Sequence, residues 1–281
     1  MAAIQIGTVC ELWRFPIKSM LGEKLEQLTV GINGTLGDRA YALREVATGR
    51  IASAKKWPDL FRFSARYTSE PCADSPGEIL ITLPDGKTVP AEDPHASEVI
   101  SQAIGATMRL ERPNPGEAAP AGIDPATVLA GMPVDQFFPG MGADQLPDYF
   151  RLSSGSFFDS ATIHIIATGT LDHLKRLRQG IGDTDPRRFR ANIYVKSANT
   201  AEGFAEDRWL GHNLGVGEGP VIKDLRPALR CVMTTHPQSE LPRDYGIFHT
   251  TARNHQNKLG VYCAIERAGI VKLGDPVCLL D

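Results

Sequence analysis

Short apolar runs separated by turn sequences dominate the first 67 residues and predict β-structure. Such runs are rich in strand-forming side chains and are bounded by Gly, Pro, Asn and Asp. Residues 78–89 predict a hairpin, because Pro84-Asp85-Gly86 is a favourable turn sequence between two apolar segments. Three further strands are expected, at residues 7–15, 25–30 and 39–44, with a loop over residues 16–22.

A helical pattern follows these strands, and then the periodicity is lost. Asp93 is expected to cap a helix with Pro94 in its first turn, and the apolar side chains that follow share one face until Gly105. From residue 113 to about 147 prolines and glycines accumulate without a sustained pattern, which is typical of a long connection. We therefore expect an N-terminal domain over residues 1–112, a connection over 113–149 and a C-terminal domain over 150–281.

The C-terminal segment opens with a buried-strand pattern over residues 162–167 and a helix in which Leu171, Leu174, Leu177 and Ile181 share one side. Thr170 is the expected N-cap of this helix. Residues 215–220 have the glycine content of a nucleotide-binding loop, but no helix or P-loop lysine follows, so a turn is predicted. Four more strands are expected, at residues 193–195, 260–267, 270–273 and 277–280. The fold class is therefore α+β and strand-rich, with two β-barrel-like domains and a few helices.

Composition narrows the classes of partner. The chain has 281 residues, a formal net charge of −3 and 42% hydrophobic residues, so it can bury a large core and carries no global positive field. Nucleic acid and membrane are accordingly not expected as partners. The five cysteines are widely spaced without a CxxC pair, and no secretory signal or 18-residue apolar run is present. A cytoplasmic protein with reduced thiols is expected.

The main chemical candidate is Cys231, which lies in the polar, turn-rich run of residues 225–244. Arg230 precedes it, and a neighbouring cation favours the thiolate, the form that binds soft metals or attacks electrophiles. The alternative is a small packed side chain without reactivity, which is the usual fate of a free cysteine. The histidines show no zinc-ligand spacing and there is no GxSxG motif, so neither a classical zinc site nor a serine hydrolase is expected.

Several weak signals suggest anion binding elsewhere. Lys18-Ser19 and Asp38-Arg39 lie at expected strand ends, and the strand-to-helix turn around Thr168 and Thr170 leaves free N–H groups. Residues 187–190 hold three arginines, which can grip phosphate or carboxylate. Each of these features has an ordinary alternative, a solvated loop or a solvated helix face.

Six segments together resemble the MOSC proteins, a family named for the C-terminal domain of molybdenum cofactor sulfurase. RFPIKSMLGE and LGDRAYAL resemble the family's N-terminal β-barrel domain. The MOSC domain itself is resembled by RFRANIYV, FAEDRWLG, LRCVMTTHPQ and GVYCAIERAGIVKLGDPVCLL. Members with both domains include the amidoxime-reducing components, which bind molybdenum-molybdopterin and reduce N-hydroxylated compounds. Pyridoxal phosphate binding is a further property attached to the family.

The resemblance implies a role for each matching residue. Cys231 matches the molybdenum ligand and catalytic residue of the family. The residues that match cofactor contacts are Lys18, Ser19, Arg39, Thr168, Thr170, Arg190, Asn192, Arg230 and Tyr262. Ala191 replaces a proline of the family pattern, no second cysteine precedes Cys231 in a CxRC arrangement, and His236-Pro237 replaces an acidic residue and proline.

The resemblance implies a molybdenum-cofactor oxidoreductase that reduces small N-hydroxylated or N-oxide substrates. No cluster of four cysteines for an iron–sulfur centre is present, so electrons are expected from a separate donor protein of the ferredoxin or flavoprotein reductase type. Two alternatives remain open at this point. The chain could carry the cofactor or sulfur without turnover, or it could keep the fold without the cofactor.

Overall fold

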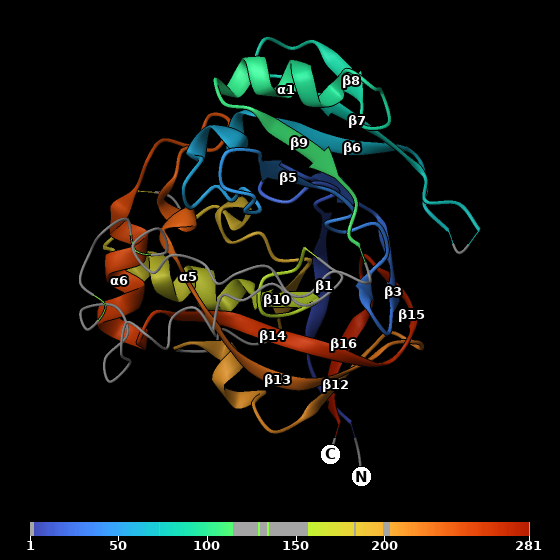
Figure 1. The fold of residues 1–281 in the computed structure, drawn as a ribbon. Coiled ribbons are helices and arrows are strands. Elements are labelled where there is room, and N and C mark those ends of the chain that lie inside the picture. Colours follow the sequence, from blue (N-terminus) through green and yellow to red (C-terminus); the bar gives the residue numbers. More distant parts are fainter. Residues whose placement is uncertain are drawn as a thin grey trace.

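The fold is built around a closed seven-stranded β-barrel. The computed structural model describes residues 3–72, 74–114, 157–182, 184–198 and 203–280, together with residues 129 and 134. Within these residues the barrel order is β11-β10-β14-β13-β12-β16-β1, and β1 pairs with β11 to close the ring (Figure 1). The barrel strands are β1 (Ile4–Arg14), β10 (Ile163–Ala167), β11 (Ile193–Ser197), β12 (Asn213–Val216), β13 (Val221–Leu229), β14 (Lys258–Arg267) and β16 (Pro276–Leu280).

The first strand belongs to a barrel whose other strands all come from the second half of the chain. β1 pairs antiparallel with β11 on one side, where Leu12 faces Ile193, and with β16 on the other. Gly7 lies in both ladders, and a Cβ there would come within 2.3 Å of the Lys196 carbonyl oxygen. The predicted boundary near residue 112 therefore does not separate the sheets, because the barrel needs residues 4–14. The predicted connection over 113–149 lies almost wholly outside the described residues.

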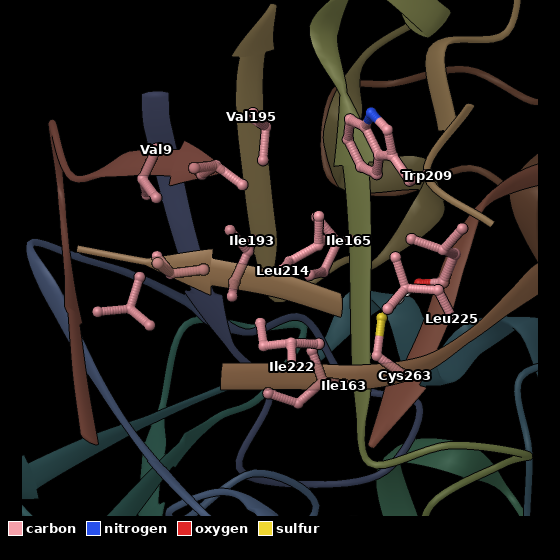
Figure 2. Close-up of a cluster of buried hydrophobic side chains, with 14 of the residues drawn as sticks. Val9, Ile163, Ile165, Ile193, Val195, Trp209, Leu214, Ile222, Leu225 and Cys263 are labelled. Atoms are coloured by element: carbon pink, nitrogen blue, oxygen red, sulfur yellow. Dashed lines mark hydrogen bonds between the residues drawn. The ribbon is translucent and has the colours of Figure 1, made fainter. Parts of the chain in front are cut away.

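Alternating inward-facing side chains fill the barrel. Val9 from β1, Ile165 from β10, Ile193 from β11 and Ile222 from β13 are at most 2% exposed and meet in one cluster, which Trp209 covers at one side (Figure 2). β10 and β11 are parallel and are joined by a crossover that contains α5. A crossover is required because parallel strands cannot be joined by a tight turn.

Two smaller sheets from the N-terminal half surround a second apolar cluster, which includes Phe61, Phe63 and Ile81. They are β5 (Ala42–Glu45) with β9 (Met108–Glu111), and β6 (Ser64–Ser69) with β7 (Glu78–Thr82) and β8 (Thr88–Pro90). With α1 they lie together as a separate layer at one end of the barrel (Figure 1).

A third small sheet packs on the barrel itself. It consists of β15 (Gly269–Lys272), β3 (Gln27–Gly31) and β4 (Gly34–Thr35), and Leu28, Val30 and Val271 belong to the apolar cluster of the barrel. β2 (Glu23–Leu25) extends from β1. Since β15 is C-terminal and β3 is N-terminal, this sheet too combines both parts of the chain.

The described residues contain three α-helices, and α5 and α6 lie side by side against the barrel (Figure 1). α6 was not predicted; Asp244 caps it by accepting a hydrogen bond from the Gly246 N–H at 2.9 Å. The α-helices are α1 (Ala96–Ile104), α5 (Thr168–Leu177) and α6 (Tyr245–His255), and the 3₁₀ turns are η1 (Pro58–Arg62), η2 (Pro186–Phe189), η3 (Ala205–Arg208) and η4 (Val232–Thr235).

The predicted strand-rich α+β fold is confirmed, with differences at several element ends. The hairpin at 78–89 is formed by β7 and β8. The turn predicted over 215–220 connects β12 to β13 and spans only residues 217–220, because residues 215 and 216 belong to β12. α5 begins at Thr168, two residues before the predicted cap at Thr170, and it ends before Ile181, which is 72% exposed. Asp93 accepts a hydrogen bond from the His95 N–H in the turn before α1 and does not cap the helix itself.

Candidate functional site

Cys231 lies where β13 ends and η4 begins. The backbone just before Cys231 is held by Asn257, a fully buried residue that makes two hydrogen bonds with Arg230. The Arg230 N–H donates to the Asn257 carbonyl at 2.9 Å, and the Asn257 side-chain amide donates to the Arg230 carbonyl. Asn257 has φ = 59°, a left-handed conformation that asparagine adopts more readily than most residues. Because both backbone groups of Arg230 are paired, the half-buried thiol one residue later has a defined direction.

A pocket opens beside this thiol at the junction of the barrel and the N-terminal layer. Six of its lining residues are cations and one, Asp159, is a carboxylate. A chain with a net charge of −3 therefore concentrates positive charge at one place, which favours an anionic ligand. The lining residues are Lys18, Ser19, Arg39, Lys55, Phe158, Asp159, Ala161, His164, Arg188, Phe189, Arg190, Asn192, Leu229, Arg230, Cys231, Met233, Thr234 and Tyr262.

Two lysines from the N-terminal layer share the one carboxylate. Lys18 Nζ donates to Asp159 Oδ1 at 2.8 Å and to the Phe157 carbonyl at 2.9 Å, while Lys55 Nζ donates to Asp159 Oδ2 at 2.9 Å. Burial lowers the pKa of Lys18 to about 8 even though Asp159 opposes the shift. Burial alone would raise the pKa of Asp159, but the two ammonium groups outweigh it and lower that pKa below its usual range. Asp159 is therefore an anion at neutral pH.

Arg190 forms the floor of the pocket between two aromatic rings. Its guanidinium lies 4.2 Å from the Phe15 ring centroid and 5.5 Å from that of Phe61, and it donates to the Met20 carbonyl at 2.6 Å. Burial, with the nearby charge of Arg39, lowers the pKa of Arg190 to about 9. A buried cation whose charge is weakly compensated gains from an anionic ligand.

Three lining residues have a left-handed backbone. Ser19, Arg39 and Arg190 have φ values of 66°, 50° and 54°. Non-glycine residues in this region are uncommon and each costs of order 1 kcal/mol, so such residues cluster where a site needs a particular side-chain direction. Here the conformation occurs at three residues that the sequence had already singled out.

Arg230, one residue beyond the end of β13, and Tyr262 on β14 are in direct contact in the pocket wall. Arg230 donates to the Tyr262 hydroxyl at 2.6 Å, and its guanidinium carbon lies 5.3 Å from the centroid of that ring. The Nε of Arg230 and the Nε2 of His164 are buried without a hydrogen-bond partner among the described residues. Burial, with the charge of Arg230, lowers the pKa of His164 well below its usual value, so this imidazole is neutral. Unpaired buried polar nitrogens of this kind are expected where a polar ligand completes a site.

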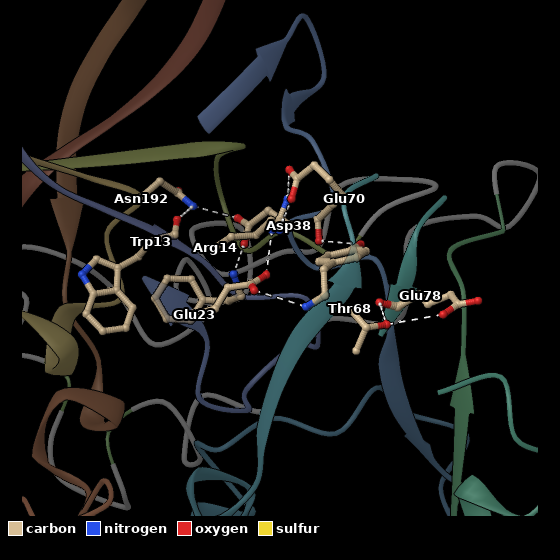
Figure 3. A network of polar contacts seen from close by, with 11 residues as sticks. Trp13, Arg14, Glu23, Asp38, Thr68, Glu70, Glu78 and Asn192 are labelled. Carbon is tan, nitrogen blue, oxygen red and sulfur yellow. Dashed lines mark hydrogen bonds and ion pairs between the residues drawn. The ribbon is translucent and has the colours of Figure 1, made fainter. Parts of the chain in front are cut away.

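Asn192 joins the site to the barrel and the N-terminal layer. Its side-chain amide donates to Asp38 Oδ2 at 2.9 Å and to the Trp13 carbonyl at 3.3 Å (Figure 3). Asp38 also accepts from the Phe15 N–H at 2.7 Å and pairs with Arg39. Asn192 thus orients Arg39 through Asp38, which gives it a structural role at the pocket in addition to lining it.

The structure brings eight of the ten predicted site residues to this pocket and leaves two outside. The eight are Lys18, Ser19, Arg39, Arg190, Asn192, Arg230, Cys231 and Tyr262. Thr168 and Thr170 do not line it: the Thr168 hydroxyl accepts from the Ser197 N–H, and the Thr170 hydroxyl donates to buried Glu206. The predicted anion site at the start of α5 is therefore not part of the pocket, because Glu206 and Ser197 already occupy the polar groups of this turn.

His236 also lies outside the pocket lining. It is 4% exposed and packs near Phe61, with ring centroids 6.4 Å apart, while Arg243 lies 3.4 Å from its Nδ1. The replacement of the family's acidic residue therefore alters a contact between η4 and the N-terminal layer. It does not alter the pocket wall.

Ten lining residues were not among the predicted site residues, and four of these carry ionisable side chains: Lys55, Asp159, His164 and Arg188. Lys55 and Asp159 belong to none of the motifs that the sequence offered, so neither had a local signal. Arg188 belongs to the arginine run, and its burial could have been inferred only from the fold; it donates to the His236 and Pro242 carbonyls.

Cys231 is the sole cysteine that lines the pocket. Burial raises the pKa of the Cys263 thiol in the barrel core, so that residue stays a neutral packed side chain. Within the described residues no group of three or more His, Cys, Asp or Glu side chains could hold a metal ion. A metal at this site would therefore need most of its ligands from a bound cofactor, with the Cys231 thiolate as the protein's contribution.

Fold and site together define a class of protein: a closed barrel with a second β-layer, a cationic pocket between them and one thiol in the pocket wall. Two domain families match this chain in sequence, the MOSC domain over residues 153–278 and the MOSC N-terminal beta barrel domain over residues 6–119. The chain therefore contains a MOSC domain preceded by a MOSC N-terminal beta barrel domain, as its sequence motifs predicted.

Relatives match along nearly the whole chain at low identity. The mitochondrial amidoxime-reducing component 1 of Mus musculus is 24% identical over 98% of this chain and 83% of its own length, and that of Homo sapiens is 26% identical over 98% and 84%. Among solved structures, the YUAD protein from Bacillus subtilis covers 99% of this chain and 98% of its own, at 12% identity and a TM-score of 0.45. No helix within the described residues is long and apolar enough to cross a membrane.

Proposed function

We propose that this protein is a molybdenum-cofactor-dependent reductase of small N-hydroxylated or N-oxide compounds. The observation that carries the proposal is the coincidence, in one pocket, of a single thiol with six cations. A molybdenum-pterin cofactor has matching requirements, since its phosphate is anionic and its metal takes soft thiolate ligands. The distant relationship to amidoxime-reducing components supports the same assignment.

The residues fit such a cofactor in a defined way. The Cys231 thiolate would ligate the metal, and the cationic groups of Arg190, Arg39 and Arg230 would hold the anionic part. The unpaired Nε of Arg230 and the left-handed backbone of Ser19, Arg39 and Arg190 are features of this structure that a bound anion would account for. Bound here, the cofactor would supply two-electron reduction of the substrate N–O bond.

The surrounding side chains would orient the substrate and limit water. Phe158, Phe189, Leu229 and Met233 supply the apolar part of the lining of the pocket that holds Cys231. The Tyr262 hydroxyl, held by Arg230, is a hydrogen-bonding group in the same wall. The proposal includes a cytoplasmic location. It also includes a separate electron-donor protein of the ferredoxin or flavoprotein reductase type, because the sequence contains no cluster of four cysteines that could hold an iron–sulfur centre.

A reductant assay tests the activity. Protein with measured molybdenum content should oxidise reduced viologen when benzamidoxime or a simple hydroxylamine is added, and should be inactive with NADH alone. The Cys231→Ala variant should lose this turnover, whereas Cys72→Ala, at an exposed cysteine outside the pocket, should keep it. Absence of turnover across a panel of N-oxides, amidoximes and hydroxylamines with loaded protein would refute the reductase. Transfer of cofactor to another apo-enzyme in the same experiment would favour a carrier.

A further inference from the structure

A second pocket lies at the end of the barrel that faces away from the N-terminal layer. It has a volume of about 250 Å³ and is lined by residues where β1 begins, where β11 and β16 end, and in and after η3. Both chain termini lie at this end, whereas the layer with α1 lies at the other (Figure 1). β1 spans Ile4–Arg14, roughly 30 Å at the usual rise per residue, and Phe15 beyond it packs on Arg190 of the cationic pocket. The two pockets are therefore separate.

Most of the lining of this second pocket is apolar. Ile6 and Leu279 come from the paired strands β1 and β16, and Ala205 comes from η3. Ile4 also lines the pocket and is 64% exposed, so part of this apolar surface is open to water. An apolar cavity of about 150 Å³ is large enough to bind benzene, and the larger volume here admits a bicyclic ring.

Two adjacent lining residues offer unused hydrogen-bond donors. Within the described residues, neither the indole N–H of Trp209 nor the guanidinium of Arg208 has a hydrogen-bond or ion-pair partner. Trp209 is only 4% exposed, and Figure 2 shows its nitrogen on the edge of the ring turned away from Leu225 and Cys263. A buried tryptophan usually finds an acceptor for this group, as Trp13 does with Glu11 at 2.9 Å. The Trp209 N–H therefore points to a ligand that brings an acceptor.

The two carboxylates that precede Arg208 in sequence are engaged elsewhere. Glu206 is 2% exposed and accepts two hydrogen bonds at the start of α5. Asp207 Oδ2 lies 2.9 Å from His255 Nε2 at the end of α6. These contacts anchor η3 at two points. Arg208 is thus presented at the pocket without a counter-ion from its own element.

We propose that this pocket binds a small hydrophobic carboxylate. Arg208 and the Trp209 N–H donate to the carboxylate oxygens, and the apolar lining encloses the hydrocarbon part. A guanidinium beside an N–H donor selects an anion over a neutral compound of the same size, because charge-assisted hydrogen bonds are the stronger ones. The site is independent of the cofactor pocket and of the proposed reductase activity.

Titration with 2-naphthoate at pH 7 tests the site, since this probe combines a bicyclic ring with a carboxylate. The chain has three tryptophans, so a ¹H–¹⁵N spectrum of the protein contains three indole N–H signals. The single substitutions Trp13→Phe, Trp57→Phe and Trp209→Phe assign them. The Trp209 signal should shift and saturate, while the other two stay in place. No shift of the Trp209 signal at millimolar 2-naphthoate, or a shift confined to the other two, would overturn the proposal.

The role of charge is tested by one variant and one neutral probe. Arg208→Gln, at an exposed position, should bind 2-naphthoate at least roughly fivefold more weakly than wild type. Arg253→Gln is the matched control, because it removes an exposed arginine of α6 outside the pocket lining and should leave the affinity unchanged.

2-Naphthylmethanol keeps the ring and lacks the charge, so wild type should bind it at least roughly fivefold more weakly than 2-naphthoate. Equal affinity of wild type and Arg208→Gln for the acid, or equal affinity of wild type for acid and alcohol, would overturn the carboxylate site. These measurements involve neither molybdenum nor turnover, so their failure is distinguishable from failure of the reductase assignment.

Discussion

Some residues of the pocket wall are both buried and charged, and burial disfavours the charged form. Arg190 is stacked on Phe15 and bonded to a backbone carbonyl, yet burial and Arg39 lower its pKa to about 9. An anionic ligand relieves this conflict. The neighbouring Arg187 differs, because it pairs with Asp185 and Glu240 at the surface and does not line the pocket.

Substitutions of Arg190 and Arg187 should therefore distinguish a direct contact with the cofactor from a general effect of positive charge at the surface. Arg190→Ala should weaken cofactor retention by about 1.5–3 kcal/mol, or roughly 10- to 100-fold, because a hydrogen bond to a charged group is lost. Arg187→Ala removes the same charge three residues earlier and should retain the cofactor as wild type does. Pterin fluorescence after gel filtration measures retention. Equal retention by both variants would place the cofactor phosphate away from Arg190.

His236 should make stability depend on acid. Burial, with the charge of Arg243, lowers the pKa of His236 from 6.5 to about 4. Between these values the unfolded chain binds the proton and the folded chain does not, so the free energy of unfolding should fall as pH falls from about 6.5 to 4. The loss attributable to His236 is roughly 3 kcal/mol.

Urea unfolding at pH 7, 5.5 and 4.5 checks this expectation. His236→Gln should flatten the decline, while His249→Gln, at an exposed position on α6, should leave it as in wild type. An identical pH dependence in wild type and His236→Gln would show that His236 does not contribute.

At the scale of elements, the sequence predicted strands and short helices where the local pattern was strong. The hairpin at 78–89 and the strands of the C-terminal run follow from period-two alternation and turn residues. α6 was missed because its buried side chains are only Ile247, Phe248, Thr251 and Ala252, too few for a clear apolar stripe. The start of α5 shifted because Glu206, 36 residues beyond Thr170, satisfies the groups that a capping side chain would have taken.

The backbone between β13 and η4, which positions Cys231, is held by Asn257, and no sequence motif pointed to this residue. Asn257→Ala should remove both the side-chain hydrogen bond to the Arg230 carbonyl and the residue type that tolerates φ = 59°. A cost of about 2–4 kcal/mol in the free energy of unfolding is expected. Asn254→Ala is the control, because Asn254 is exposed on α6 and its side-chain amide donates to the Thr250 carbonyl of the same helix at 2.8 Å. Equal stability of the two variants in urea would mean that the Asn257 clamp contributes little.

For the whole molecule, the sequence predicted two β-domains and a site that needs both, but it could not predict how they are joined. The pairing of β1 with β11 and β16 spans nearly the entire chain, and no local pattern encodes such a contact. The same limit applies to Lys55 and Asp159, which meet only because the N-terminal layer folds back onto the barrel. Eight of the ten residues chosen from motif matches line the pocket, whereas the side chains that pair with them could be identified only from the fold.

Barrel closure should depend on Gly7. A Cβ at this position would lie 2.3 Å from the Lys196 carbonyl oxygen and 2.7 Å from Val195, both on β11. Gly7→Ala should therefore cost about 1–3 kcal/mol through displaced backbone. Gly219→Ala, where the nearest atom would be 3.7 Å away, should be close to neutral. Thermal unfolding measures both variants, and a neutral Gly7→Ala would show that β1 and β11 pair more loosely than the structure indicates.

The central claim is that this pocket holds a molybdenum-pterin cofactor through the Cys231 thiolate. Its most direct test is the molybdenum and pterin content of protein purified from a cofactor-competent host, by elemental analysis and pterin fluorescence. Wild type and Cys72→Ser should retain both in equal amounts, while Cys231→Ser should lose most of its molybdenum and keep pterin on the cationic wall. Wild-type protein without either component would contradict the cofactor assignment, and wild-type molybdenum content in Cys231→Ser would contradict the assignment of the ligand.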